Sequence, residues 1–149
     1  MIKKKNMEIK FKKLHKDAVI PTSMKNGDIG LDLTAIGVIN TTNKSNFGYI
    51  EYDTGIAVEI PEGYGGFIFP RSSISNTGMW LANSVGVIDN NYRGSIKCRF
   101  KAVPNTTIYN IGERIAQLVI LPVVQTSLVE VKNLTKTERN DKGFGSSNE

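Results

Sequence analysis

The sequence has few of the residues and none of the long apolar segments that mark several classes of protein. It contains one cysteine, Cys98, and one histidine, His15, in 149 residues. Two such side chains supply neither an internal disulfide nor a zinc site made of several cysteines or histidines. No apolar run approaches the roughly 20 residues that span a bilayer. We therefore expect no disulfide framework, no zinc domain and no membrane association.

A secretory signal is also missing. Residues 1–6 include three lysines, but neither an apolar segment nor a small-residue cleavage site follows them. We expect a protein of the reducing cytoplasm, with residues 1–6 as a flexible extension.

Positive charge is concentrated near the N-terminus. The net charge is +5, and the first sixteen residues hold seven of the lysines: Lys3, Lys4, Lys5, Lys10, Lys12, Lys13 and Lys16. Such a run can attract nucleic acid, but stacking aromatics are not interleaved with it. The alternation in residues 8–12 suits an edge strand protected by lysines. We favour a solvated edge strand within residues 7–14 over a nucleic-acid site.

Short β-prone runs, rather than helical periods with caps, make up most of the chain. The clearest runs are residues 55–60, 65–69, 95–103 and 114–124, with glycine, proline and asparagine between them. This pattern predicts a single all-β domain, a sandwich or barrel. One helical turn is expected at residues 72–77, capped by Ser72 or Ser73. Cys98 falls in a predicted strand, which favours a buried core residue over a nucleophile.

The apolar pattern stops after Val131. Residues 133–149 are polar, charged and contain glycine, so they are expected to form a mobile tail. The predicted division is a β domain at residues 1–132 and an arm at residues 133–149.

Residues 86–94, reading GVIDNNYRG, are the centre of the candidate site. A short apolar strand breaks into Asp89, Asn90 and Asn91, and a new strand is expected from Arg93, which predicts a β-hairpin. Backbone groups left free beyond the last ladder bond can bind a planar polar ligand. Asp89 and Tyr92 would then address the same small molecule. The alternative is an ordinary turn with a solvated acid and a half-buried ring.

Two further clusters offer charged groups. Asp28 and Asp32 share strand parity, with Asp28 better suited to a turn and Asp32 to a rigid strand. Arg71 stands beside Ser72 and Ser73 at the start of the expected helical turn, which is typical of a phosphate site. A surface salt bridge beside a capping serine explains the Arg71 cluster equally well.

The last two clusters lie near the C-terminus. Arg114 and Gln117 can reach a ligand from one strand, although an ion pair between Glu113 and Arg114 is an equal alternative. In the tail, cations, hydroxyls, glycines and one aromatic ring come together at Arg139, Lys142, Phe144, Ser146 and Ser147. Phe144 has no apolar neighbour in the tail, so a ligand or another subunit must cover it.

In this order, the five clusters resemble the five motifs of the homotrimeric dUTP pyrophosphatases (dUTPases), with the phage and Gram-positive bacterial members most similar. The resemblance covers about residues 28–147. It implies a distorted jelly-roll trimer with three active sites, each built from three chains. It further implies Mg²⁺-dependent hydrolysis of dUTP to dUMP and pyrophosphate in a bacterial cytoplasm or a phage-infected host cell. Such activity limits uracil incorporation into DNA and supplies dUMP for dTMP synthesis.

The resemblance also implies roles for residues at the base and the metal. Asp89 activates the water that attacks the α-phosphorus, and the Tyr92 ring lies beneath the deoxyribose. Asp32 holds Mg²⁺ through water. The residues that read the uracil edge are Asn83, Gly86, Val87 and Ile88.

Phosphate contacts are implied for two other chains. The α and β phosphates are bound by Arg71, Ser72, Ser73 and Gln117 of another subunit. The arm stacks Phe144 on uracil and binds the γ-phosphate with Arg139, Ser146 and Ser147. The chain departs from the family at Asn140, Lys142 and Asn148, where glycine is usual. Asparagine tolerates positive φ better than lysine, so the arm is expected to be looser or differently shaped.

Two rival functions remain open. A dCTP deaminase has the same fold but needs a glutamate in the strand after the hairpin, where this chain has Ile96, Lys97, Cys98 and Arg99. Some phage dUTPases are similar to regulators that bind a repressor or another host protein. The N-terminal strand and residues 41–48 are the places where such a partner is expected.

Overall fold

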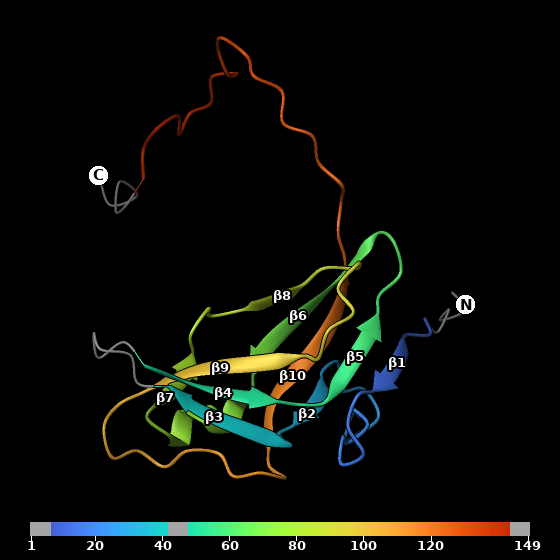
Figure 1. Cartoon of the computed structure of the whole chain (residues 1–149). Helices are drawn as coiled ribbons and strands as arrows, with labels where there is room; N and C mark the ends of the chain where they lie inside the picture. The colour runs from blue at the N-terminus through green and yellow to red at the C-terminus, as the bar shows by residue number, and fades with distance from the viewer. Residues whose placement is uncertain (1–6, 42–47, 144–149) are drawn as a thin grey trace.

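The computed structural model describes residues 7–41 and 48–143, which form a β protein with one short 3₁₀ turn (Figure 1). The strands, in chain order, are β1 (Lys10–Lys13), β2 (Leu31–Thr34), β3 (Gly37–Thr41), β4 (Tyr49–Asp53), β5 (Ile56–Glu59), β6 (Tyr64–Pro70), β7 (Met79–Leu81), β8 (Gly86–Ile88), β9 (Lys97–Ala102) and β10 (Arg114–Pro122). The 3₁₀ turn η1 spans Ser72–Asn76. The all-β prediction is confirmed, and each of the four predicted strands overlaps an observed one.

The strands form two four-stranded antiparallel sheets and one small pair. The sheet orders are β2-β10-β6-β8 and β3-β4-β9-β7, while β1 pairs with β5. Many sheet neighbours are distant in sequence, as a jelly roll requires. The chain crosses between the sheets after β7 and again after β8, and these two crossings carry the candidate site.

The core lies where the inward faces of the two large sheets meet. Leu33, Ile115 and Leu118 come from one sheet, and Tyr52, Cys98 and Phe100 from the other; all are fully buried. The rings of Tyr52 and Phe100 meet edge to face at 5.7 Å. Along β9 the buried Cys98 and Phe100 alternate with outward charged side chains, as period-2 strand geometry dictates.

Cys98 is therefore a core residue, as predicted. Burial raises the pKa of its thiol to about 12. The nucleophile of cysteine chemistry is the thiolate, and at neutral pH this thiol is protonated.

The lysine-rich N-terminal segment forms an exposed edge strand. All four residues of β1 are exposed, and Lys10 Nζ lies 3.0 Å from Glu59 Oε1 on β5. Charged side chains on such an edge disfavour strand pairing with another molecule. The edge-strand prediction is confirmed, over a shorter range than residues 7–14.

No helix in the described part of the chain has the length and apolar character to cross a membrane.

The β-hairpin prediction for residues 86–94 is wrong, because the strands on either side of this turn do not pair with each other. β8 pairs with β6, whereas β9 begins only at Lys97 and pairs with β4 and β7. Tyr92 N donates to Asp89 O at 3.0 Å, which closes a turn between the two sheets. Arg93 contributes its side chain to this turn and does not start a strand. The sequence pattern marked the turn correctly, but not the sheet to which each flanking strand belongs.

The helical turn is present, but the predicted serine cap is wrong. Arg71 occupies the N-cap position with extended backbone angles, and no side chain caps the turn. The Ser73 hydroxyl instead accepts a hydrogen bond from Arg71 Nη1 at 3.3 Å. The hydroxyl thus binds the neighbouring guanidinium rather than the free N–H groups of η1.

After β10 the chain leaves the sheets. Residues 123–143 extend away from the body without a strand (Figure 1). The segment carries exposed apolar side chains, among them Leu128, which is 100% exposed. The division at residue 132 remains a prediction.

Candidate functional site

A cavity of about 410 Å³ lies between β8 and β9, where the two strands diverge into different sheets. Its lining residues are Ile68, Leu81, Ala82, Asn83, Gly86, Val87, Ile88, Lys97, Cys98 and Arg99. β7 pairs with β9 only from Phe100 onward, and Ala82 N adds one bond to Arg99 O. Within the ladders that the structure describes, one edge of β8 and the start of β9 therefore face this cavity without a neighbouring strand. Their backbone N–H and C=O groups can bind a flat ligand with amide-like groups.

Gly86 is the residue that lets β8 close this cavity. It is buried, and an added Cβ would lie 3.1 Å from Ile68 Cβ on the neighbouring strand. The crossing before it is a tight turn, with Ser84 at φ 61° and Ser84 N donating to Leu81 O at 3.1 Å. Asn83 lies on that turn and lines the cavity. Asn83, Gly86, Val87 and Ile88 thus line one cavity; that they read a uracil edge stays a prediction.

The turn after β8 presents Asp89 and Tyr92. The Asp89 side chain is exposed, and Tyr92 is 43% exposed. Tyr92 Oη donates to Ser95 O at 3.0 Å, and the Ser95 hydroxyl bonds to Asp53 Oδ1. Asp89 also lines a second hollow with Tyr64, Phe67 and Asn90. The acid and the ring follow directly on the strand that lines the first cavity.

Asp32, on β2, is the centre of a cluster with Arg71, which follows β6, and Arg114, the first residue of β10. Its Oδ1 lies 3.0 Å from Arg71 Nε, and its Oδ2 lies 2.9 Å from Arg114 Nη1. The Asp32 side chain is only 15% exposed. One carboxylate thus orients two guanidinium groups and leaves an excess of positive charge. Such an arrangement suits an anionic ligand.

The cluster borders a hollow of about 570 Å³ that Ser72 and Gln117 also line. Gln117 Nε2 donates to Pro70 O at 3.0 Å. Asp28 lines the same hollow, but its carboxylate accepts Lys25 N at 2.8 Å, which confirms the turn role. The ion pair considered between Glu113 and Arg114 is replaced by Arg114 with Asp32. Glu113 instead accepts Asn110 N at 2.5 Å.

The side chains of this cluster cannot by themselves supply the full set of ligands that a hard cation needs. Among the residues that the structure describes, no group of three or more His, Cys, Asp or Glu side chains lies close enough to hold a metal. Both oxygens of Asp32 already bind guanidinium groups. Mg²⁺ commonly keeps several waters and takes its other ligands from substrate phosphates. Mg²⁺ held in that way would need only a water-mediated contact from this chain, which the Asp32 carboxylate would supply.

The described part of the arm contains a local turn. Arg139 Nε donates to Lys142 O at 2.9 Å, and Asn140 adopts φ 45°. Asn140 also exchanges two 3.0 Å hydrogen bonds with Thr137. Asparagine thus adopts the positive φ that a glycine at this position would adopt freely. Phe144, Ser146 and Ser147 lie outside the described residues.

The residues lining the β8–β9 cavity and those around Asp32 do not overlap. Arg139 borders neither. One chain therefore presents the expected base and phosphate residues as separate clusters.

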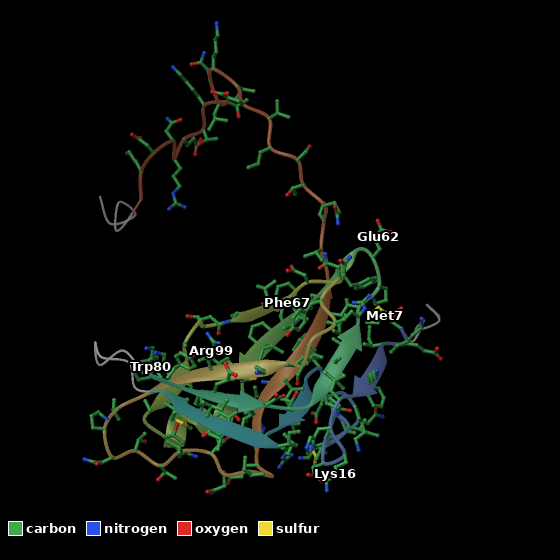
Figure 2. The ribbon with its side chains drawn as sticks, in the orientation of Figure 1. Met7, Lys16, Glu62, Phe67, Trp80 and Arg99 are labelled. Carbon is green, nitrogen blue, oxygen red and sulfur yellow. The ribbon has the colours of Figure 1, made fainter. Side chains whose placement is uncertain are left out.

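Three groups of charged contacts were missed from the sequence. Glu51 is buried on the outer face of β4 and binds Lys97 at 3.0 Å and Arg99 at 2.7 Å. Burial raises the pKa of Glu51, but the hydrogen bonds from Arg99 and Lys97 outweigh it, so the pKa lies below its usual value. Figure 2 shows Arg99 on β9, near β8. The alternating charges of β9 signalled an outward face, but nothing local identified Glu51 as their partner.

The other two are Arg114 with Asp32, described above, and Arg93. Arg93 Nη1 donates to Asn90 O at 2.7 Å and to Tyr92 O at 2.9 Å. An arginine following an Asx-rich turn was the only local signal for this contact.

Solved structures first identify the class of fold. The chain superimposes on the dUTPase of Staphylococcus bacteriophage 80alpha, solved with dUPNHPP, with a TM-score of 0.77 and 27% identity over 95% of this chain and 98% of that one. That phage protein is described as controlling transfer of virulence genes by a G protein-like mechanism. A phage phi11 dUTPase structure, described with a structural Mg(II) ion, has a TM-score of 0.69 at 22% identity, covering 85% of this chain and 98% of that one. The fold is the dUTPase-like jelly roll.

Sequence relatives then identify the family. The dUTPase family model matches residues 16–148. The deoxyuridine 5′-triphosphate nucleotidohydrolase of Hydrogenobaculum sp. is 42% identical, covering 94% of this chain and 97% of its own. The enzyme of the same name from Tropheryma whipplei (strain Twist) is 40% identical, and the match covers 90% of this chain and 92% of that enzyme. The chain belongs to the dUTPase family. The closer likeness to phage and Gram-positive bacterial members stays a prediction.

Proposed function

We propose that this protein is a dUTP diphosphatase, which hydrolyses dUTP to dUMP and pyrophosphate. The observation that carries the proposal is the cavity between the diverging β8 and β9, followed directly by Asp89 and Tyr92 on one turn. The names of the curated relatives support the same reaction. The activity would limit uracil incorporation into DNA and supply dUMP for dTMP synthesis.

Uracil would lie in the β8–β9 cavity. Backbone groups of Gly86, Val87 and Ile88, with the Asn83 amide, would read its hydrogen-bonding edge. The Tyr92 ring would lie beneath the deoxyribose and leave no space for a 2′-hydroxyl. Selection for a 2′-deoxy sugar by shape suits a rigid aromatic side chain.

Asp89 would act as the general base. As water attacks the α-phosphorus, its proton passes to the Asp89 carboxylate while the bond from the α-phosphorus to the bridging oxygen breaks. Pyrophosphate leaves with that oxygen, and dUMP receives the oxygen of the water. A dCTP deaminase would need an acid on β9 facing the base, and the described residues of β9 contain none.

The phosphates would be bound by other subunits of a homotrimer. Because the base and phosphate clusters of one chain do not overlap, we infer that Arg71, Ser72, Ser73 and Gln117 act on a ligand held by a neighbouring β8–β9 cavity. Guanidinium groups fixed in advance stabilise the charge that develops on the leaving group. The arm, residues 133–149, would bring Phe144 to the uracil and Arg139, Ser146 and Ser147 to the γ-phosphate.

Mg²⁺ is the metal we propose for this reaction. It would neutralise charge on the triphosphate, with Asp32 contacting it through water. A phage phi11 dUTPase mutant of the same fold is described with a structural Mg(II) ion.

A protein partner is proposed as an addition to the activity, because the similar 80alpha enzyme is described as a regulator of gene transfer. We assign it to one of two separate places, β1 or the segment at residues 41–48, of which 42–47 lie outside the described residues. We further propose that the protein acts in the cytoplasm, without a nucleic-acid partner.

The test is pyrophosphate release with Mg²⁺ from dUTP, dTTP, dCTP and UTP in parallel. Release from dUTP alone is the expected result. Ammonia release from dCTP would favour the deaminase, and no turnover of any nucleotide by folded protein would contradict the proposal.

A further inference from the structure

We propose that Arg93 is a positioning residue, which holds the turn of Asp89 and Tyr92 in the shape that the reaction needs. The inference rests on the proposed function for its catalytic consequence. The structural claim, that one side chain holds this turn in place, can be tested without measuring dUTP hydrolysis.

The contacts of Arg93 are concentrated on the turn itself. Nη1 donates to Asn90 O at 2.7 Å and to Tyr92 O at 2.9 Å. Hydrogen bonds from a charged donor are shorter and stronger than neutral ones. One nitrogen therefore joins two carbonyls of a turn that no ladder bond supports.

These bonds complete the fixing of Tyr92. Its N–H donates to Asp89 O at 3.0 Å, its carbonyl accepts from Arg93, and its hydroxyl donates to Ser95 O at 3.0 Å. Gly94 lies directly against the ring, because an added Cβ would overlap the Tyr92 hydroxyl. Backbone and ring are thus held at both ends, and Arg93 supplies the contact on the carbonyl side.

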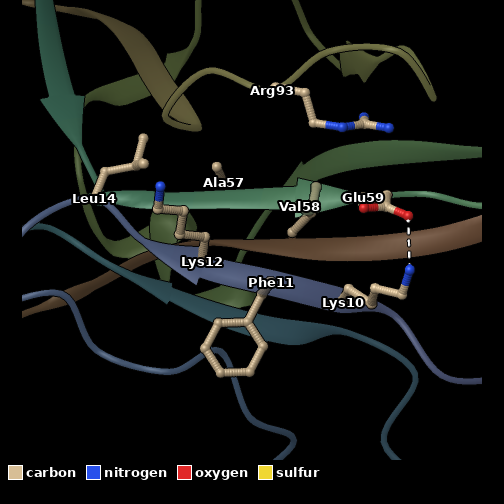
Figure 3. Close-up of a pocket in the computed structure, with 8 residues that line it drawn as sticks. All are labelled: Lys10, Phe11, Lys12, Leu14, Ala57, Val58, Glu59 and Arg93. Atoms are coloured by element: carbon tan, nitrogen blue, oxygen red, sulfur yellow. Dashed lines mark hydrogen bonds and ion pairs between the residues drawn. The ribbon is translucent and has the colours of Figure 1, made fainter.

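The guanidinium forms no close ion pair with any described residue that would explain its position. Lys10 lowers the pKa of Glu59 with help from the charge of Arg93, but the hydrogen bonds of Arg93 go elsewhere. Arg93 lines a groove with β1 and β5, together with Lys12 and Glu59 (Figure 3). In that groove Glu59 is paired with Lys10 at 3.0 Å. Across residues 7–41 and 48–143, Arg93 forms no ion pair, and its hydrogen bonds go to the turn.

Loss of Arg93 should therefore change the site while leaving the two sheets intact. Both carbonyls would turn to solvent, and Asp89 and the Tyr92 ring would sample other positions. Small misplacements of a reacting group can cost about 100-fold in rate. A displaced ring also excludes a 2′-hydroxyl less well, so selection of dUTP over UTP should fall.

The experiment compares Arg93→Ala with Arg93→Lys, in which an ammonium can still donate to both carbonyls, and with Lys12→Ala, which removes another cation from the same groove. Arg93→Ala is expected to lower kcat by about 10-fold to 100-fold and to lower the dUTP-to-UTP ratio of kcat/KM by about tenfold. Arg93→Lys should recover most of the lost kcat and most of the lost selectivity. In Lys12→Ala, both kcat and the dUTP-to-UTP ratio of kcat/KM should stay within about twofold of the parent values.

Hydrogen exchange of the residue 89–95 amides gives a readout that does not depend on activity. Exchange should become faster in Arg93→Ala and stay unchanged in Lys12→Ala. Unchanged exchange and an unchanged dUTP-to-UTP ratio in Arg93→Ala would overturn the inference. If the parent protein hydrolyses no nucleotide, the proposed function fails, and the exchange comparison still decides the role of Arg93. If Arg93→Ala does not fold, the comparison uses Arg93→Gln, which keeps a neutral donor.

Discussion

Asp32 and Arg71 are joined by a hydrogen-bonded ion pair of 3.0 Å across 39 residues of sequence. The second oxygen of the same carboxylate binds Arg114 at 2.9 Å. Asp32 therefore has a structural role beside the metal contact proposed for it. It aligns two guanidinium groups whose remaining N–H donors are available to an anion.

Asp32→Asn should weaken this alignment. The amide keeps the shape but loses the charge that balances two cations, so we expect the free energy of unfolding to fall by about 1–3 kcal/mol. We also expect kcat/KM for dUTP to fall by about tenfold or more. Urea unfolding and initial rates at saturating Mg²⁺ measure the two effects.

Asp28→Asn is the matched control, because Asp28 lines the same hollow but accepts a bond only from its own turn. Equal losses in the two variants would show that the pairing of Asp32 with the arginines has no special role.

The pH dependence of stability should carry the signature of Cys98. Burial raises the pKa of the thiol to about 12 in the folded protein, whereas an exposed thiol titrates near pH 8.5. The folded state thus favours the protonated thiol. Its contribution to stability is complete below about pH 8.5 and is lost progressively as pH rises toward 12.

Urea unfolding between pH 8 and pH 10.5 measures this effect, with Cys98→Ala as the comparison. The free energy of unfolding should fall more steeply with pH in the parent than in the variant. Parallel curves would mean that the thiol is accessible to solvent in the folded protein.

Much of the fold and of the site could be predicted because the signals are local. β-prone runs between glycine, proline and asparagine predicted the strands around Ile56, Ile68 and Ile115, and the Asx-rich turn pointed to Asp89 and Tyr92. The partner of a strand is set by distant packing, so the pairing of β8 with β6 instead of β9 was not readable. Long-range charge pairs were missed for the same reason, since Glu51 is 46 residues from Lys97 and Arg114 is 82 from Asp32.

A shared active site predicts complementation between two inactive variants. Arg71→Ala should lose a phosphate contact, and Asp89→Asn should lose the general base. If the two groups serve one ligand from different chains, random mixed trimers should regain about one quarter of the parent activity per site. Rate assays after subunit exchange, with each variant alone as control, measure this. No recovery in mixed trimers of verified composition would place both residues in a single-chain site.

The central claim, that Asp89 drives hydrolysis of dUTP, is tested most directly by turnover and binding in Asp89→Asn. General-base catalysis contributes about 100-fold to 10,000-fold, so kcat for dUTP should fall by about that factor. Binding of the non-hydrolysable analogue dUPNHPP should stay within a few-fold of the parent, because the base and phosphate contacts remain. Turnover close to that of the parent protein would contradict the account.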